Sequence, residues 1–164
     1  MNEEQNLSCI TGTAWPGVHY FCSTRQGGVS VSPYNSLNLG THVDDNADHV
    51  AANRARLTAL LPEAPCWLEQ VHGVDVAEFN DDRTGQGTQP MARADAAVTT
   101  RMHRVLAILT ADCLPVVLSD EAGSVLGVAH AGWRGLAAGV LENTVAVMRR
   151  NQGASSPLRA WIGP

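Results

Sequence analysis

Residues 114–129, which read LPVVLSDEAGSVLGVA, decide the fold. Two runs rich in valine and leucine, Leu114–Ser119 and Val125–Ala129, lie on either side of the short segment Asp120–Gly123. β-Branched residues favour strands, and a short segment with aspartate and glycine favours a tight turn between two strands. This stretch therefore predicts a β-hairpin and, with it, a β-sheet.

Further strand and helix signals lie on both sides of this hairpin. Apolar and β-branched runs predict strands over residues 18–24, 66–71, 74–79, 95–99, 104–110 and 158–162. Capping residues at 44–48 predict a helix that ends at Pro62, and apolar spacing predicts a second helix over 136–150. Residues 80–90 are rich in polar and turn-forming residues and predict a surface loop.

These elements predict one α/β (α+β) domain, with a mixed β-sheet flanked by helices. We expect an N-terminal lead-in over residues 1–17 and the domain itself over 18–164. A length of 164 residues suits a single domain. The contents of 45% hydrophobic and 16% charged residues are typical of a globular protein.

The charge pattern excludes several classes of function. The net charge is −5, and all eleven cations are arginines, because the chain contains no lysine. A Schiff-base lysine and a P-loop lysine are therefore excluded. An acidic chain with scattered arginines also lacks the basic stripe of a nucleic-acid-binding protein.

The sequence favours a cytoplasmic protein without a membrane segment. Its N-terminus is acidic and polar, unlike a secretory signal, and no apolar run approaches the roughly 20 residues that span a bilayer. The four cysteines are widely spaced and form no CxxC motif, so we expect reduced thiols.

Three segments combine a metal-binding side chain with the end of a predicted strand. They contain His72, Cys113 and His130. Two imidazoles and one thiolate suit zinc and leave a fourth coordination position open. Their wide separation in sequence indicates a site assembled by the fold, as in catalytic metal centres. The alternative is a core cysteine with two unrelated polar histidines.

Charged side chains beside these segments are candidates for catalysis and anion binding. Asp112 precedes Cys113 and is either a general base, a partner of a ligand, or a cap at the strand end. Arg25 precedes two glycines, and Arg134 precedes the second predicted helix. Both arginines are candidates for holding an anion, and a solvated surface arginine is the alternative.

Four segments together resemble the YfiH-like family, also labelled polyphenol oxidase or laccase, peptidoglycan editing factor and purine nucleoside phosphorylase. They span residues 24–40, 70–73, 109–115 and 129–135, and the resemblance extends from about residue 18 to the end. It implies metal binding by His72, Cys113 and His130. Because that family continues past Gly163-Pro164, we expect a C-terminally shortened chain that is less stable or more prone to associate.

The family labels imply different chemistry, and composition helps to choose among them. Six histidines cannot supply a blue copper and a three-copper cluster, so zinc is favoured over copper. The resemblance then implies phosphorolysis of adenosine, inosine, guanosine or methylthioadenosine to base and ribose 1-phosphate, with adenosine deamination as a related activity. Phosphate would be held by Arg25 or Arg134. Asn38 and Gln70 would contact the base or ribose.

Two alternatives from other classes remain open. The first is a cysteine hydrolase acting in peptidoglycan editing, with Cys113 as nucleophile, His130 as base and Asp112 or Gln70 in support. The second is an inactive fragment. The oligomeric state and the preferred nucleoside stay open as well.

Overall fold

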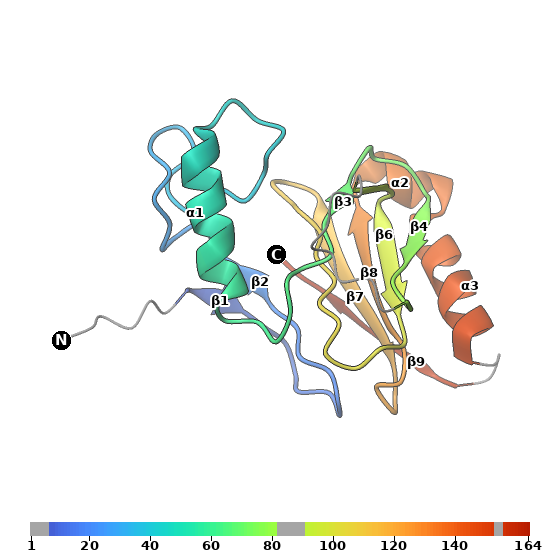
Figure 1. The fold of residues 1–164 in the computed structure, drawn as a ribbon. Helices are drawn as coiled ribbons and strands as arrows, with labels where there is room; N and C mark the ends of the chain where they lie inside the picture. The colour runs from blue at the N-terminus through green and yellow to red at the C-terminus, as the bar shows by residue number, and fades with distance from the viewer. Residues whose placement is uncertain (1–6, 82–90, 153–155) are drawn as a thin grey trace.

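The structure is a computed structural model that describes residues 7–81, 91–152 and 156–164 (Figure 1). From residue 82 on, the predicted surface loop over 80–90 lies outside the described residues. The strands are β1 (Cys9–Ile10), β2 (Cys22–Ser23), β3 (Leu68–Glu69), β4 (Val76–Glu78), β5 (Ala92–Arg93), β6 (Ala96–Thr99), β7 (Leu114–Asp120), β8 (Leu126–Ala131) and β9 (Leu158–Ile162). The helices are α1 (Ala47–Thr58), α2 (Trp133–Ala138) and α3 (Val140–Gln152).

A five-stranded mixed sheet in the order β4-β6-β8-β7-β9 forms the centre of the domain. β4 runs parallel to β6, and the other neighbouring pairs are antiparallel. The predicted hairpin is confirmed as β7 and β8, which pair from Leu114 opposite Ala131 to Ser119 opposite Leu126. The predicted mixed sheet flanked by helices is thereby confirmed.

Helices α2 and α3 lie on one face of this sheet (Figure 1). Val140, Val147 and Met148 of α3 are buried in one cluster with alternate residues of β6, β7 and β8. Gly127 of β8 is required by this packing, because a Cβ atom there would lie 2.8 Å from the sulfur of Met148. The helix is thus held close to the centre of the sheet.

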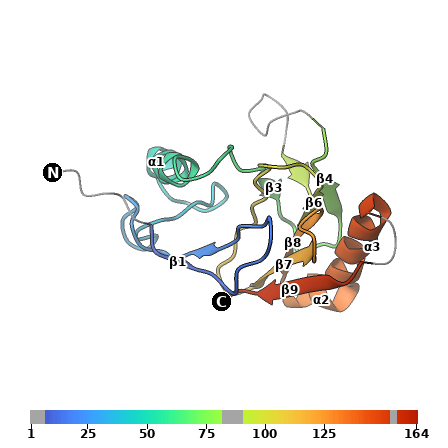
Figure 2. The same ribbon diagram turned by 90° about the horizontal axis from the view of Figure 1, so that it is seen from below.

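The opposite face of the sheet is covered by the N-terminal part of the chain (Figures 1 and 2). Tyr20 lies between Trp15 and Trp161, with ring centroids 4.5 Å and 5.2 Å away. These aromatic side chains pack against a second buried cluster that includes Val117 and Val128. Helix α1 lies further out and has a core of its own, formed around Leu7, Leu37 and Leu57.

Asn53 on α1 organises the loop over residues 28–38. Its side chain is fully buried, accepts a hydrogen bond from the Val29 N–H at 2.8 Å and donates to Ser30 Oγ at 2.9 Å. It also donates to the carbonyls of Ser36 and Asn38, at 3.1 Å and 2.9 Å. One amide therefore replaces the hydrogen bonds that a strand partner would supply to this loop.

Two predicted elements differ in the structure for identifiable reasons. The predicted helix over 136–150 is two helices, because Gly139 adopts a φ of 99° and ends α2. The predicted strand over 104–110 is wrong: Leu106 forms only an isolated bridge with Cys66. Its apolar residues pack under the aromatic cluster instead of extending the sheet.

The N-terminal strand prediction also changes. The expected strand over 18–24 is reduced to β2, which pairs with β1 from the expected lead-in region. The strand β5, which pairs with β3, was not predicted, because two residues carry no usable periodicity. No helix in the described part of the chain is long and apolar enough to cross a membrane.

Replacing Asn53 with leucine is expected to destabilise the domain, because buried loop N–H and C=O groups lose their partners. We expect the free energy of unfolding to fall by about 2–4 kcal/mol, given about 1–3 kcal/mol for each unsatisfied group. Urea denaturation followed by fluorescence measures this. Ala52→Gln, on the exposed side of the same helix, is the control and should change stability by less than about 0.5 kcal/mol. Equal stability of both variants would contradict the role of Asn53.

Candidate functional site

The structure brings His72, Cys113 and His130 together at one end of the central sheet. Their metal-binding atoms all lie within 4.8 Å of one another, and Cys113 Sγ is 4.0 Å from His72 Nε2. His72 lies in the turn that follows β3, and Cys113 immediately precedes β7. The register of β7 and β8 pairs Leu114 with Ala131 and so places Cys113 beside the end of β8, where His130 lies.

Asp95, at the start of β6, holds two of these three residues in place. Its side chain is 0% exposed, and its Oδ1 atom lies 2.9 Å from Nδ1 of His130. The carboxylate also accepts hydrogen bonds from three successive backbone N–H groups, those of Val71 at 3.0 Å, His72 at 2.9 Å and Gly73 at 2.7 Å. With Nδ1 of His130 engaged, Nε2 is the atom left for a metal.

The hydrogen bonds to Asp95 offset the cost of burying a carboxylate. Burial by itself raises the pKa of Asp95, but the bonds from His130 and from the backbone of 71–73 outweigh it and hold the pKa below its usual range. His72 has a φ of 59°, in the left-handed region that non-glycine residues seldom adopt. The three N–H groups can converge on one carboxylate because the backbone adopts this conformation.

The surroundings of Cys113 favour the neutral thiol when no cation is near. Burial raises the pKa of this thiol, and the negative charge of Asp112 raises it further. The Asp112 carboxylate accepts a long hydrogen bond of 3.7 Å from the Sγ–H of Cys113. A metal cation would reverse this balance, because thiolates are the form that binds metals.

Gly132 leaves the space that Cys113 and His72 occupy. A Cβ atom at this position would lie 2.9 Å from Cys113 Sγ and 3.2 Å from His72 Cδ2. Both distances are shorter than ordinary van der Waals contacts. The glycine between His130 and α2 is therefore part of the site, although it supplies no side chain.

The three side chains form a possible metal-binding group, whose nitrogen and sulfur donors are of the kind that zinc binds. Ligand atoms on one tetrahedral zinc lie about 3.3–3.6 Å apart, given bonds of about 2.0–2.3 Å. Cys113 Sγ and His72 Nε2 are 4.0 Å apart, and the three ligand atoms lie within 4.8 Å of one another, so they must approach by up to about 1.5 Å to reach that range. Two nitrogens and one sulfur from the protein leave one coordination position for a further ligand.

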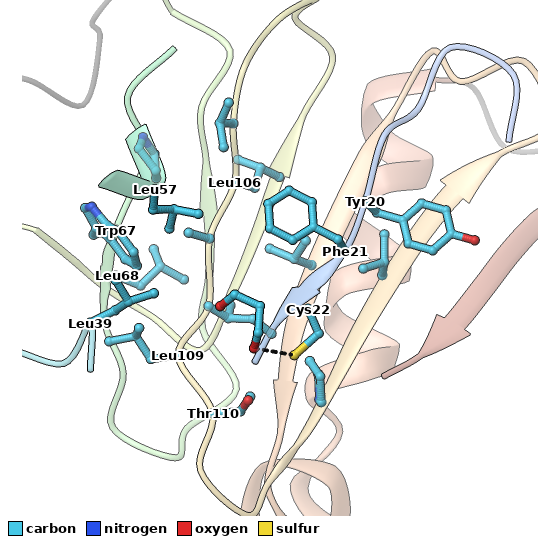
Figure 3. A pocket seen from close by; sticks show the side chains of 18 of the residues that line it. Tyr20, Phe21, Cys22, Leu39, Leu57, Trp67, Leu68, Leu106, Leu109 and Thr110 are labelled. Atoms are coloured by element: carbon cyan, nitrogen blue, oxygen red, sulfur yellow. Dashed lines mark hydrogen bonds between the residues drawn. The ribbon is translucent and has the colours of Figure 1, made fainter. Parts of the chain in front are cut away.

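The three side chains line a cavity of about 1880 Å³ between the sheet and the N-terminal layer. Figure 3 shows part of its wall, where apolar and aromatic side chains such as Phe21, Trp67 and Leu106 surround the space. Four of the residues predicted to bind substrate or take part in catalysis also line it, namely Arg25, Asn38, Gln70 and Asp112. Arg134 does not; it lies on the exposed side of α2 with its guanidinium 4.6 Å from the Trp133 ring.

The predicted polar contacts already have partners within the protein. The Nε of Arg25 donates to the Asn35 carbonyl at 2.8 Å, and none of the residues that the structure describes accepts from its terminal nitrogens. Asn38 donates to Asp45 Oδ2 at 2.9 Å. The amide of Gln70 forms two hydrogen bonds with the backbone of Leu109, of 2.8 Å and 2.6 Å, and so holds one cavity wall in position.

Asp95 and Gly132 are the functional residues that sequence reasoning missed. The signal for Asp95 was a single acidic residue at the start of the otherwise uncharged strand 95–99, where an ionised side chain is buried only if it is paired. The signal for Gly132 was its position between a proposed ligand and a helix. Neither signal names a partner, because both partners come from distant segments.

Comparisons with known proteins show which family the chain belongs to. Residues 19–164 match the family model described as multi-copper polyphenol oxidoreductase laccase. The chain belongs to this family. The resemblance to YfiH proteins is thereby confirmed, and the relatives include "Purine nucleoside phosphorylase YfiH" of Escherichia coli, 51% identical over 165 residues. A purine nucleoside phosphorylase of Pseudomonas aeruginosa is 46% identical over 153 residues.

Solved structures share the fold of this YfiH-family chain. A YfiH protein from Bacillus licheniformis matches with a TM-score of 0.79 and 33% identity, over 88% of this chain and 57% of that one. A protein from Neisseria meningitidis matches with a TM-score of 0.77 and 40% identity, over 88% and 56%. The Escherichia coli alignment covers 96% of this chain and 64% of that protein, and the Pseudomonas aeruginosa alignment covers 92% and 59%. The chain thus spans less than two thirds of these relatives.

Replacing Asp95 with asparagine is expected to weaken metal binding about 10–100-fold, the usual cost of losing a carboxylate behind a histidine ligand. The amide cannot accept from all three N–H groups of 71–73 and from His130 as a charged carboxylate does. Competition with a chromophoric zinc chelator measures the affinity. Asp75→Asn, an exposed neighbour on the chain leading into β4, is the control and should bind zinc like the unmodified protein. Unchanged affinity in Asp95→Asn would refute its positioning role.

Replacing Gly132 with alanine should displace Cys113 or His72 while the sheet stays folded. We expect at least about a tenfold loss of zinc affinity, because the ligand geometry of zinc is demanding. Gly73→Ala is the matched control, since a Cβ atom there meets its nearest atoms at 3.4 Å and 3.5 Å, which are ordinary contacts. The same chelator competition is used, with circular dichroism to report the fold. If Gly132→Ala binds zinc normally, the close approach is not required.

Proposed function

We propose that the chain carries the zinc site of a purine nucleoside phosphorylase, which converts a nucleoside and phosphate to a free base and ribose 1-phosphate. The observation that carries this proposal is the convergence of His72, Cys113 and His130 at the wall of one large cavity. The names of the relatives support the choice of reaction, since both the Escherichia coli and the Pseudomonas aeruginosa proteins are called purine nucleoside phosphorylases.

Zinc is preferred to copper on the chemistry of the donor set. The site offers two imidazoles and one thiolate, and the described residues form no second group of three or more metal-binding side chains. A multicopper oxidase needs several copper centres, held mainly by histidine. A zinc ion supplies a Lewis acid without redox chemistry.

The cavity suits a nucleoside in shape and polarity. Its aromatic and aliphatic wall, with Phe21, Trp67 and Leu106, offers flat apolar surface to a purine ring. Asn38 and Gln70 line the same space and are our candidates for contacts with base or ribose. Arg25 is the candidate for the phosphate, because its Nε–H is held by the Asn35 carbonyl while its terminal nitrogens have no partner within residues 7–81, 91–152 and 156–164.

The reaction breaks one bond and forms another at the same carbon. An oxygen of phosphate bonds to C1′ of the ribose, the C1′–N9 bond breaks, and the leaving purine takes up a proton. The protein residues orient the two substrates and exclude water. The proton comes from hydrogen phosphate, and we assign its transfer to the purine to the carboxylate of Asp112, which lines the cavity beside Cys113 and would accept the proton and pass it on. Deamination of adenosine, which consumes water and releases ammonia, is a related activity that the same site would support.

The cysteine hydrolase alternative rests on the 4.0 Å between Cys113 Sγ and His72 Nε2. His130 remains the predicted base, because the bond from its Nδ1 to Asp95 leaves Nε2 as the basic atom, and His72 is a second imidazole within reach of the sulfur. A cysteine hydrolase needs the thiol close to an imidazole base, and it needs no metal. Chelation and thiol alkylation therefore separate the two functions: chelation abolishes the phosphorylase and leaves the hydrolase active.

The decisive experiment is chromatography of the products formed from adenosine, with and without phosphate. We expect adenine and ribose 1-phosphate only when phosphate is present, and inosine without phosphate if the site also deaminates. Cys113→Ala should no longer hold zinc, because the substitution removes the thiolate ligand and its negative charge. Its activity should fall at least about 1,000-fold. Cys9→Ala, which removes an exposed thiol outside the cavity, is the control. Full zinc content without activity in Cys113→Ala would support the hydrolase, and unchanged activity would exclude both.

A further inference from the structure

Arg54 on α1 is a half-buried cation with neutral partners. Its Nε donates to the Leu39 carbonyl at 2.8 Å, and its guanidinium carbon lies 4.1 Å from the centroid of the Trp67 ring. Among the residues that the structure describes, none contributes a carboxylate within ion-pair distance of Arg54, and none accepts from its two terminal NH₂ groups. Four N–H donors of a fixed positive charge are therefore unused.

The side chain faces the same cavity as the proposed zinc site. Arg54, Leu39 and Trp67 all line this cavity, and Figure 3 shows Trp67 and Leu39 together at one side of it. Burial lowers the pKa of Arg54, but an arginine stays protonated at neutral pH. A partly desolvated cation without an anionic partner costs free energy, which a bound anion would offset.

The charge distribution around the cavity favours an anion at this place. Arg25 and Arg54 are both anchored to the segment over residues 35–39, Arg25 through Asn35 and Arg54 through Leu39. The carboxylates among the described lining residues, Glu69 and Asp112, belong to β3 and to the loop before β7. Among the described lining residues, the wall formed by α1 and its neighbouring loop therefore carries two arginines and no carboxylate. The remaining walls carry both carboxylates together with Arg101 and Arg104.

The contacts of Arg54 also orient it for binding. Stacking on Trp67 fixes the plane of the guanidinium, and the bond to the Leu39 carbonyl fixes its rotation. An arginine held in this way loses little conformational freedom when a tetrahedral oxyanion binds to its terminal nitrogens. Lysine could not reproduce the arrangement, since its ammonium group has no planar fork.

We propose that Arg54 binds the phosphate group of a ligand in the cavity and acts there as an anion-binding arginine in addition to Arg25. The choice of phosphate as the anion rests on the proposed function. Arg134, which the sequence analysis suggested for anion binding together with Arg25, lies outside the cavity. The phosphate group has two possible sources, inorganic phosphate or the 5′-phosphate of a nucleotide, and the test separates them.

The test measures binding without turnover. Isothermal titration calorimetry of the 164-residue chain is carried out with inorganic phosphate alone, with adenosine 5′-monophosphate and with adenosine. We expect Arg54→Gln to weaken binding of a phosphate-bearing ligand at least about tenfold, as for loss of a charge-assisted hydrogen bond, and to leave adenosine binding within about twofold. Arg54→Lys should bind the phosphate-bearing ligand more weakly than the unmodified protein and more tightly than Arg54→Gln. Arg149→Gln, which removes an exposed arginine of α3 outside the cavity, is the matched control and should bind like the unmodified protein.

A second measurement uses the unmodified protein and does not depend on a variant folding. Phenylglyoxal modifies accessible arginines, and peptide mass spectrometry locates the modified sites. Saturating inorganic phosphate or adenosine 5′-monophosphate should slow modification of Arg54 at least about fivefold and leave Arg149 unchanged, because a bound oxyanion shields the terminal nitrogens. Protection by inorganic phosphate identifies the free ion as the ligand. Protection by the nucleotide alone identifies its 5′-phosphate.

The outcomes separate this proposal from the proposed function. Phosphate binding that depends on Arg54, in a protein that cleaves no nucleoside, supports the anion site and contradicts the phosphorylase. Phosphorolysis with unchanged phosphate affinity in Arg54→Gln and without protection of Arg54 overturns the anion site and leaves the phosphorylase standing. Absence of any binding of phosphate or nucleotide by the unmodified protein also overturns the anion site.

Discussion

The buried carboxylate of Asp95 is the interaction on which the site depends. It connects β6 to the backbone of residues 71–73 and to the imidazole of His130 on β8. A carboxylate inside a protein destabilises the fold unless its oxygens accept hydrogen bonds, so folding and ordering of the site cannot be separated. The pairing of Ala96 with Ala129 sets the distance between the carboxylate and the imidazole. The register of the sheet thus determines the geometry of the site.

The second constraint is the way the N-terminal layer is ordered. This layer has few strand pairings, since β1 and β2 are two residues each. Side chains of α1 replace the missing ladder: Asn53 satisfies the loop over 28–38, and Arg54 holds Leu39. Two walls of the cavity are therefore stabilised in different ways. One wall is a regular sheet, and the other is an irregular loop held by polar side chains of a single helix.

The predictable part of the molecule was the part governed by local pattern. Valine- and leucine-rich runs on either side of a turn segment predicted the hairpin of β7 and β8, and ligand chemistry with the family resemblance singled out His72, Cys113 and His130, which the fold brings together. The break at Gly139 depended on one backbone angle, which composition alone does not reveal. Strand 104–110 failed because an apolar run packs equally well as irregular chain when a side chain, here Gln70, pairs with its backbone.

Asp95 contacts the turn over 71–73 through main-chain N–H groups alone, which affects how this protein can change during evolution. The conformation of the turn does not depend on the side chain of Val71, which is 39% exposed. Substitutions at that position alter the surface beside the metal ligands and leave their support intact. Residue 71 therefore tolerates substitution, whereas the neighbouring ligand His72 does not. This makes residue 71 a suitable position for varying the surface beside the metal ligands by directed mutagenesis.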